Sequence, residues 1–433
     1  METINLNSLQ HASKDEIKAR TDAKLQSLIK HAYNNVPYYK KKFDSLGIHW
    51  SDIKGAQDLG LLPVLTRQNI KNNPLNYFVA SSIPKSRRRL TSTTGSTGIP
   101  LRFYSDTESD ALRGMTWTFL DEWAGVRPGF NRVWLGAPRP RPHFEFRHPI
   151  RSWFEKQWFK QPEDLISVFM LKAETVPGIL EKMQKKSPYF IYGISSSIRF
   201  IASQIEEKGI AINNPPHSII GTSDTLLPAH LKSISSIFKC PVYSRYGSYE
   251  MGGGAAQTCP DVSEVMHIIP ELVILEVVDD NNIPVSPGKT GRILLTELTN
   301  YAMPFIRYDT GDIGIASDGC SCGRSFPTIR EILGRDYEQI KTFSGHRIYG
   351  WEFEAYLFYE KNYKKYITEY EIIQKGTGII LRMIPSKAYS RSIENRLKSD
   401  LNLMLGGEME VDVDSVEHIE NGPNGKKALI RII

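Results

Sequence analysis

The chain has 433 residues, more than a typical single domain, so two or three folding units are expected. Hydrophobic residues make up 40% and charged residues 24% of it, the composition of an ordinary globular chain of enzyme size. The sequence has no run of about 18 apolar residues that would form a membrane-spanning helix. Its first residues have neither the basic start nor the apolar core of a signal peptide, so a cytoplasmic protein is expected.

The charge of the chain argues against nucleic acid as a partner. The formal net charge is only +6, whereas a nucleic-acid-binding domain concentrates positive charge on one face. The densest basic stretches are residues 85–89 and 139–160. An anionic small molecule explains the first of them at least as well as nucleic acid does.

The first elements are predicted to be helical. Residues 15–46 carry apolar residues at helical spacing, among them Leu25, Leu28 and Ile29, and Pro37 interrupts this run. Residues 62–70 then suggest a short buried segment that leads into a helix cap.

Residues 91–100, TSTTGSTGIP, form a loop rich in hydroxyl groups. Six hydroxyl residues and two glycines fill positions 91–98. Glycines allow a close approach of the backbone to a ligand, and successive N–H groups and hydroxyls make a concavity suited to phosphate oxygens. A flexible surface loop is the alternative. The loop lacks the Gly-Lys-Ser/Thr ending of a Walker A motif, so any phosphate binding follows another design.

Strands and helices then alternate along the chain, which favours a layered α/β domain. Strands are expected at 132–136, 189–193, 218–221 and from 241, and helices around 198–205 and 226–238. From residue 271 the pattern changes to hairpins, with strands at 272–278 and 291–295 around a turn at 279–282. The last hundred or so residues suggest a small α+β domain, with a hairpin, a helix, two strands, a helix at 390–405 and two more strands.

An insert at residues 138–160 is rich in proline, arginine and aromatic residues. We interpret it as a covering loop over the α/β core. Contact with a membrane surface or with an acidic glycan is the alternative.

Four further motifs follow the hydroxyl loop in a fixed order: 246–250 (YGSYE), 308–312 (YDTGD), 334–348 and Gly425-Lys426. Each alone is weak. Five in order across almost the whole chain resemble the adenylate-forming superfamily of acyl-CoA synthetases, luciferases and peptide-synthetase adenylation domains. Residues 35–43 (NVPYYKKKF), 62–70 (LPVLTRQNI) and 296–312 (TELTNYAMPFIRYDTGD) are most similar to the phenylacetate–coenzyme A ligase branch, and within it to capsular-polysaccharide-biosynthesis members.

The resemblance implies a fold and an activity. The fold would be a large N-terminal layered α/β domain over residues 1–333, which binds ATP and an acid, with a small mobile α+β lid over 334–433. The activity would be ATP-dependent adenylation of a carboxylic acid, with release of pyrophosphate. Acyl transfer to coenzyme A, a carrier-protein thiol or an amine would follow, in surface-polysaccharide or secondary metabolism. The alternative is a non-catalytic nucleotide-binding subunit of a polysaccharide-assembly system.

The resemblance also assigns roles to residues. Lys426 would bridge the carboxylate and the α-phosphate, Glu250 would bind Mg²⁺, and Asp312 would accept the ribose hydroxyls. Arg335 would contact ribose or phosphate, and Tyr246 would stack on adenine or the acyl group unless it is a packed core tyrosine. The other nucleotide-binding residues would be Thr93, Thr94 (also catalytic), Gly95, Ser96, Thr97 and Gly98 at the β- and γ-phosphates, Gly221, Thr222 and Ser223 near adenine, and Gly247 and Ser248 beside Tyr246.

The chain departs from the superfamily at two positions. Ile99 stands where a lysine often precedes the proline of the loop, so backbone donors, hydroxyls, Mg²⁺ and neighbouring arginines would have to neutralise the triphosphate. The hinge aspartate would fall at Tyr337, between Asp336 and Glu338. The change at the hinge position affects the domain arrangement for acyl transfer more than the arrangement for adenylation.

Three of the four cysteines suggest a metal site. Cys259, Cys320 and Cys322 with His267 form a Cys₃His set that suits tetrahedral Zn²⁺ with no open position for water. Cysteine-bearing insertions near the same motifs also occur in the similar branch. Reduced core thiols and a redox pair are the alternatives.

The acid pocket is expected after Tyr192 and around residues 244–254. Tyr192, Tyr243 and Tyr249 hint at an aryl acid, although aromatic residues there are also ordinary packing.

Overall fold

The computed structural model describes residues 5–92, 101–136, 165–335, 339–344, 347–420 and 429–433. Its N-terminal part is helical: α1 (Leu6–Leu9), α2 (Lys14–Asn35), α3 (Pro37–Leu46), α4 (Arg67–Lys71) and, further on, α5 (Asp110–Trp123). Ser13 caps α2 by accepting from the Glu16 amide, and Pro37 begins α3 at a position where no amide donor is needed. The predicted interruption of the first helix at Pro37 is therefore confirmed.

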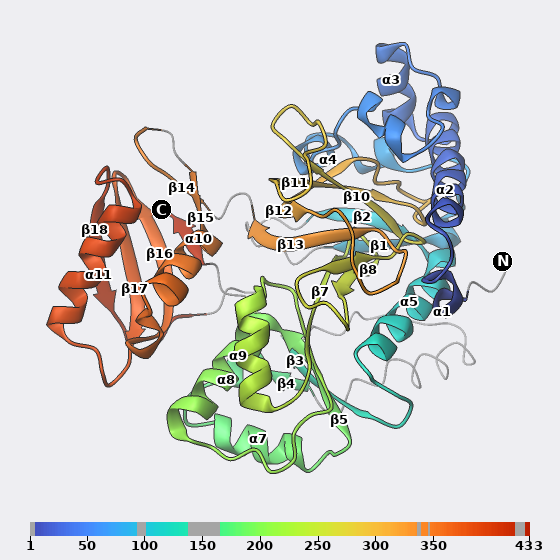
Figure 1. The fold of residues 1–433 in the computed structure, drawn as a ribbon. Coiled ribbons are helices and arrows are strands. Elements are labelled where there is room, and N and C mark those ends of the chain that lie inside the picture. The colour runs from blue at the N-terminus through green and yellow to red at the C-terminus, as the bar shows by residue number, and fades with distance from the viewer. Residues whose placement is uncertain (1–4, 93–100, 137–164, 336–338, 345–346, 421–428) are drawn as a thin grey trace.

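An 11-stranded sheet forms the centre of the molecule (Figure 1). Its strands are β3 (Asn131–Gly136), β4 (Leu165–Ser167), β5 (Tyr189–Ile194), β6 (Ile219–Thr222), β7 (Val242–Ser248), β8 (Gly253–Thr258), β9 (Met266–Ile268), β10 (Val273–Val278), β11 (Thr290–Glu297), β12 (Tyr308–Ala316) and β13 (Thr328–Arg335). They lie in the order β10-β11-β12-β13-β9-β8-β7-β6-β5-β3-β4. The strands β3 to β7 pair in parallel and the rest antiparallel. Helices join β4 to β5, β5 to β6 and β6 to β7, whereas short turns join most of the antiparallel strands.

Each half of the sheet has its own hydrophobic core. The parallel half packs against α7 (Val176–Gln184), α8 (Ser195–Lys208) and α9 (Pro228–Phe238) through buried aliphatic residues such as Leu180, Ile198 and Ile234. The antiparallel half packs against α2, α3 and α5 through a larger cluster that includes Leu28, Phe43 and Leu120. A separate ribbon, β1 (Arg88–Ser92) and β2 (Arg102–Asp106), flanks the hydroxyl loop, of which residues 93–100 lie outside the described residues.

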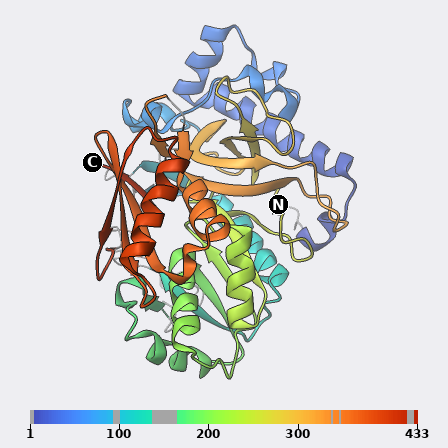
Figure 2. The same cartoon turned by 60° about the vertical axis from the view of Figure 1, so that its left-hand side comes forward.

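The C-terminal part is a smaller unit with a core of its own, and it lies in front of the sheet in Figure 2. Its elements are β14 (Gln339–Lys341), β15 (Arg347–Tyr349), α10 (Gly350–Glu354), β16 (Ile367–Lys375), β17 (Gly378–Pro385), α11 (Arg391–Met404), β18 (Glu410–Ser415) and β19 (Ile430–Ile432). A four-stranded sheet, β18-β17-β16-β19, carries α11. The predicted fold class, a large layered α/β part followed by a small α+β part, is confirmed.

The passage between the two parts lies next to β13. Gly334 and Arg335 still belong to β13, where they pair with Ile313 and Asp312 of β12. The next residues, 336–338, include the predicted hinge position Tyr337 and lie outside the described residues, as does the insert at 138–160. Placing the domain boundary after residue 333 thus stays a prediction.

In the described part of the chain, every helix is too short or too polar to span a lipid bilayer.

Candidate active site

The motif at 308–312 is fixed by a buried arginine that precedes it. Arg307 is 2% exposed, and its guanidinium donates to the Glu276 carboxylate and to the carbonyl oxygen of Leu62. A parallel bridge joins the backbone to the 62–70 segment: the Leu65 amide donates to the Arg307 carbonyl, and the Asp309 amide to the Leu65 carbonyl. Two stretches that carry the family resemblance therefore hold each other in place.

Asp312 lies at the centre of a hydrogen-bonded cluster. Its Oδ2 accepts from the Tyr246 hydroxyl at 2.6 Å, and its Oδ1 lies 2.9 Å from Arg335 Nε. Arg335 also donates through Nη1 to the Thr310 carbonyl at 2.8 Å. Burial, with Asp312 adding to it, raises the pKa of Tyr246 well above its usual range, so this hydroxyl stays protonated and donates. Three residues predicted to bind nucleotide, far apart in sequence, thus meet at one point.

Tyr246, Gly247 and Ser248 end β7, and their backbone is held close to β8. A Cβ on Gly247 would lie 1.9 Å from the Gly253 carbonyl oxygen, so only glycine fits where the two strands approach. The predicted residue Gly247 thus has a packing reason as well as a proposed binding one.

The predicted adenine-binding residues end the neighbouring strand. β6 and β7 are parallel, with Gly221 opposite Ser244 and Thr222 opposite Arg245. Ser223 follows with φ of 78°, a left-handed conformation that is uncommon for a residue with a side chain. Because the carboxyl ends of parallel strands meet at one sheet edge, Ser223 and Tyr246 lie on the same rim, where open α/β sheets bind their ligands.

Glu250 follows on the turn after β7. Its side chain is nearly buried, with the residue 7% exposed, yet its carboxylate makes no hydrogen bond or ion pair with the residues that the structure describes. Glu250 lines the large cleft described below, where its carboxylate can reach a metal ion bound there. The geometry at Glu250 therefore fits a residue that binds a hard cation such as Mg²⁺.

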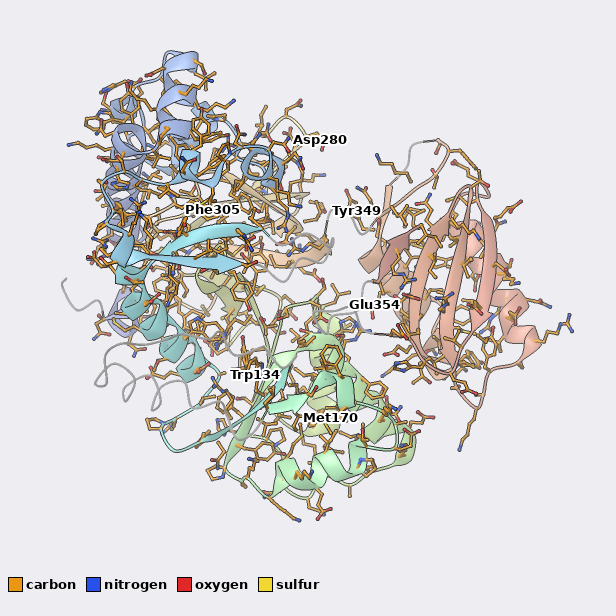
Figure 3. All side chains as sticks on the ribbon, turned by 180° about the vertical axis from the view of Figure 1, so that it is seen from behind. Trp134, Met170, Asp280, Phe305, Tyr349 and Glu354 are labelled. Atoms are coloured by element: carbon orange, nitrogen blue, oxygen red, sulfur yellow. The ribbon has the colours of Figure 1, made fainter. Side chains whose placement is uncertain are left out.

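One large cleft, with a volume of about 1890 Å³, lies between the sheet and the C-terminal part. It is lined by most of the predicted site residues that the structure describes, namely Thr222, Ser223, Tyr246, Gly247, Ser248, Glu250, Asp312 and Arg335, but not by Gly221. Small-molecule pockets are typically about 300–1,000 Å³, so the cleft has space for more than one ligand. Tyr349 and Glu354 of the C-terminal part also line it, and Figure 3 shows them on the side that faces the sheet. Of the predicted catalytic residues, Thr94 and Lys426 lie outside the described residues.

The arginines that precede the hydroxyl loop are engaged in the protein. Arg87 binds the carboxylates of Asp106 and Glu108, and Arg89 binds Asp110. Arg88 donates to two backbone carbonyls. That these arginines also neutralise the triphosphate stays a prediction.

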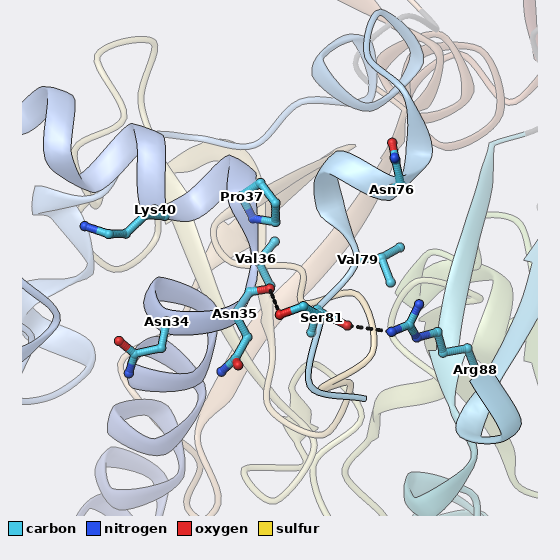
Figure 4. Close-up of a pocket in the computed structure, with 10 residues that line it drawn as sticks. Asn34, Asn35, Val36, Pro37, Lys40, Asn76, Val79, Ser81 and Arg88 are labelled. Atoms are coloured by element: carbon cyan, nitrogen blue, oxygen red, sulfur yellow. Dashed lines mark hydrogen bonds between the residues drawn. The ribbon is translucent and has the colours of Figure 1, made fainter. Parts of the chain in front are cut away.

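A second cavity of about 390 Å³ lies between α2, α3 and β1 (Figure 4). Its lining includes Asn34, Asn76 and Arg88 but none of the predicted site residues that the structure describes.

The four predicted zinc ligands converge in a separate place. Their ligand atoms all lie within 4.8 Å of one another, with Cys320 Sγ 3.8 Å from Cys259 Sγ and Cys322 Sγ 3.3 Å from His267 Nε2. A tetrahedral site with Zn–S bonds of about 2.3 Å puts two sulfurs about 3.8 Å apart, whereas a disulfide needs about 2.05 Å. The spacing fits a metal site and contradicts a disulfide.

The surroundings of this cluster fit a metal as well. His267 Nδ1 donates to the Phe326 carbonyl at 3.2 Å, which leaves Nε2 as the nitrogen that faces the sulfurs. Such a bond on the remote nitrogen is the usual orienting contact of a metal-bound histidine. Arg324 Nη1 lies 4.0 Å from Cys259 Sγ and also pairs with the Asp261 carboxylate, so its charge is shared between the cluster and Asp261.

Two features near the cleft were missed by the sequence analysis. Arg245 is buried in the middle of the motif-bearing strand β7, and Glu354 is buried between the two parts of the molecule. A charged residue inside a strand that is otherwise without charges could have signalled the first. No sequence pattern pairs Glu354 with its partners.

The fold and the cleft define a class of protein. No protein-family model matches the chain. Among solved structures, a 2-hydroxyisobutyryl-CoA ligase in the postadenylation state superposes with a TM-score of 0.77 at 18% identity, over 100% of this chain and 94% of that one. The same ligase in its thioesterification state superposes with a TM-score of 0.64 at 18% identity, over 98% of this chain and 92% of that one. The chain has the fold of the adenylate-forming ligases.

Sequence relatives narrow this class. The chain is 25% identical to the phenylacetate–coenzyme A ligase of Escherichia coli (strain K12) over 77% of its own length and 75% of that protein. It is 22% identical to protein CapK of Staphylococcus aureus over 86% and 79%. The chain is therefore an enzyme of the AMP-forming ligase kind, related to phenylacetate–coenzyme A ligases and to CapK, as the motifs predict.

Proposed function

We propose that the protein activates a carboxylic acid with ATP, forming an acyl-adenylate and pyrophosphate, and then passes the acyl group to a thiol or an amine. The observation that carries this proposal is the cluster of Tyr246, Asp312 and Arg335, which lines the same cleft as Glu250 in a fold of adenylate-forming ligases. A cytoplasmic location, where ATP is at hand, is part of the proposal.

Each described residue has a definite task in it. The Asp312 carboxylate accepts hydrogen bonds from the ribose hydroxyls, and Arg335 and Tyr246 hold it in the required orientation. Glu250 holds Mg²⁺, which supplies positive charge beside the phosphates. Because charge builds up around the α-phosphorus during the reaction, donors fixed in advance around it stabilise the transition state. The hydroxyl loop, Thr94 included, is proposed for the β- and γ-phosphates.

Lys426 is proposed to contact the reacting carboxylate and the α-phosphate when the C-terminal part closes. The higher TM-score with the postadenylation state than with the thioesterification state supports the view that the described arrangement serves adenylation. The small C-terminal part would then move as a lid for acyl transfer.

Pyrophosphate exchange over a panel of acids tests this function. The wild-type protein should incorporate labelled pyrophosphate into ATP only when its acid is present. In a Lys426→Ala variant the exchange rate should fall by a factor of about 10²–10³, as expected for a contact made in the transition state, while ATP binding changes little. Lys427→Ala is the matched control and should retain exchange. Exchange with no acid at all would contradict the proposal, and loss in the control alone would move the role to Lys427.

The acceptor is proposed from the relatives. Coenzyme A is supported by the similarity to phenylacetate–coenzyme A ligases. Amide formation on a sugar nucleotide or glycan is proposed from the resemblance of the motifs to capsular-polysaccharide-biosynthesis members. Incubating the acyl-adenylate with coenzyme A, a carrier protein or an amino sugar, and identifying the acylated product by mass spectrometry, separates these acceptors.

We further propose that Cys259, His267, Cys320 and Cys322 hold one structural Zn²⁺. Four protein ligands leave no open coordination position, so the metal would stabilise the fold and take no part in the chemistry. Elemental analysis of the purified protein should find about one zinc per chain. Metal-free protein with an unchanged melting temperature would leave these residues as reduced thiols.

A further inference from the structure

Arg245 is a buried arginine in the strand that carries the nucleotide-binding motif. It is 2% exposed, and its guanidinium carbon lies 5.0 Å from the ring centre of Trp117 and 5.7 Å from that of Tyr192. Arginine is rarely buried unless its donors are paired. The partners of this side chain therefore show whether it serves the fold alone.

Two of its nitrogens are bonded within the protein and one is not. Nε donates to Gln257 Oε1 at 2.7 Å, and Nη2 donates to Asp121 Oδ1 at 2.7 Å. Nη1 is buried and has no hydrogen-bond partner among the residues that the structure describes. An unsatisfied buried donor is costly, and in a native protein it points to a bonding partner outside the described residues, such as a bound ligand.

The position of Arg245 places this donor beside the nucleotide site and on the other face of the strand. Side chains alternate along a strand, so Arg245 and Tyr246 point to opposite faces of β7. Tyr246 faces Asp312, and Arg245 faces α5 with Trp117 and Asp121. Arg245, Trp117, Tyr192 and Trp134 all line the large cleft, the last of them labelled in Figure 3. The arginine therefore belongs to an aromatic compartment next to the place proposed for adenylation.

The local charge decides which kind of acceptor fits. The Arg245 and Asp121 side chains form an ion pair, so the positive charge already has a counter-charge. A ligand carboxylate would add an uncompensated negative charge close to Asp121, which is unfavourable in a buried site. An uncharged oxygen satisfies Nη1 without this cost.

We propose that this compartment binds the acid substrate and that Arg245 is its specificity-determining residue, selecting an aromatic acid with an uncharged oxygen acceptor, a hydroxyl or a carbonyl, on the ring. The inference rests on the proposed adenylation. It adds the class of acid. The ring of the acid is flat and lies against Trp117 and Tyr192, and the ring carries an oxygen that accepts a hydrogen bond from Arg245 Nη1. The reacting carboxyl group lies toward Tyr246, on the nucleotide side.

Matched acids test this inference in pyrophosphate exchange. The probes are phenylacetate and its hydroxyl-, acetyl- and methyl-substituted forms at each ring position, because methyl resembles hydroxyl in size but accepts no hydrogen bond. At one ring position or more, the oxygen-bearing acid should exceed its methyl counterpart by about tenfold or more in kcat/KM. Arg245→Met should abolish this preference while still using the methyl acid, and Arg245→Lys should keep part of it.

Arg132→Met is the matched control. Arg132 is exposed, and its charge also acts on Tyr192, yet it is not buried against the compartment. This variant should keep the preference. Wild-type exchange without any advantage of the oxygen-bearing acids would overturn the inference alone, whereas absence of exchange with every acid would contradict adenylation as well. An equal loss for all acids in Arg245→Met, in protein with an unchanged melting temperature, would instead assign the arginine to the reacting carboxyl group.

Discussion

The Asp312 carboxylate shows how single residues are prepared for a ligand. Tyr246 and Arg335 bind one oxygen each, so the carboxylate is fixed before any nucleotide arrives. A preorganised acceptor loses little side-chain entropy on binding. The three residues come from β7, β12 and β13, and only the family motifs, not their spacing, linked them in the sequence.

We expect Asp312→Asn to weaken ATP binding by about tenfold or more, because the amide keeps the shape but loses the charge that strengthens the hydrogen bonds. Calorimetric titration with ATP measures the dissociation constant directly. Asp280→Asn, at an exposed turn remote from the cleft, is the control and should leave it unchanged. Equal affinities of wild type and Asp312→Asn would show that the ribose lies elsewhere.

At the scale of elements, the alternation of strands and helices was predictable because the buried strands are short apolar runs bounded by turn residues. The strands at 132–136, 189–193 and 218–221 appear within a residue or two of the predicted ends. The order of the strands was not predictable. Placing β9 between β8 and β13 depends on long-range pairing, such as His267 opposite Thr328, that no local pattern encodes.

That pairing assembles the proposed zinc site. The β8–β9 hairpin puts His267 opposite Gln257, two residues before Cys259, and the pairing of β9 with β13 brings the chain after Cys322 alongside. A metal at this point would fasten three strands and the turn that precedes β13 to one another. Loss of the metal would therefore release the segments that follow the motifs at 246–250 and 308–312.

Cys322→Ser should remove the metal and lower the melting temperature by roughly 5 °C, which corresponds to about 2 kcal/mol for a large domain. Cys240→Ser is the matched control, since Cys240 is a buried thiol in the α9 core and belongs to no metal cluster that the structure describes. Zinc content and thermal unfolding are measured together. Equal melting temperatures for wild type and Cys322→Ser would contradict a stabilising metal.

At the scale of the whole molecule, a buried charge cluster joins the C-terminal part to the rest. Glu354 of α10, 4% exposed, binds the Arg199 guanidinium of α8 and lies 2.9 Å from His230 Nε2 of α9. His230 Nδ1 accepts from the Leu227 amide at 3.1 Å, so the ring is neutral and its Nε2 donates to Glu354. Figure 3 shows Glu354 between the two parts of the molecule.

This cluster makes stability depend on pH. Burial, and then the charge of Arg199, lower the pKa of His230 from 6.5 despite the nearby carboxylates of Glu354 and Asp224. The unfolded chain therefore takes up a proton below about pH 6.5 that the folded chain refuses, and stability falls as the pH falls. Burial raises the pKa of Glu354, but Arg199 and His230 outweigh it and lower the value from 4.5 to about 2, so a second loss follows below about pH 4.5.

We expect the denaturation midpoint to drop between about pH 8 and about pH 5.5, and His230→Gln to make this drop smaller, because glutamine can donate to Glu354 but does not titrate. The exposed His11, which follows α1 and is more than 180 residues from each member of the cluster in the sequence, supplies the control variant His11→Gln, which should keep the wild-type slope. Identical pH profiles for wild type and His230→Gln would show that His230 does not carry this dependence.

The same cluster should bias the two halves of the reaction. If the described arrangement serves adenylation, contacts that exist only across it favour adenylation over acyl transfer. Glu354→Gln keeps the shape but removes the negative charge that pairs with Arg199, at a cost of about 1–2 kcal/mol for a pair that is partly open to solvent on the Arg199 side. Pyrophosphate exchange should then slow by about fivefold or more, while acyl transfer from the preformed adenylate keeps its rate.

Glu360→Gln, exposed on the same part of the chain, is the control. A proportional loss in both half-reactions would mean that Glu354 only supports the fold, because a contact that distinguishes two arrangements must change their ratio.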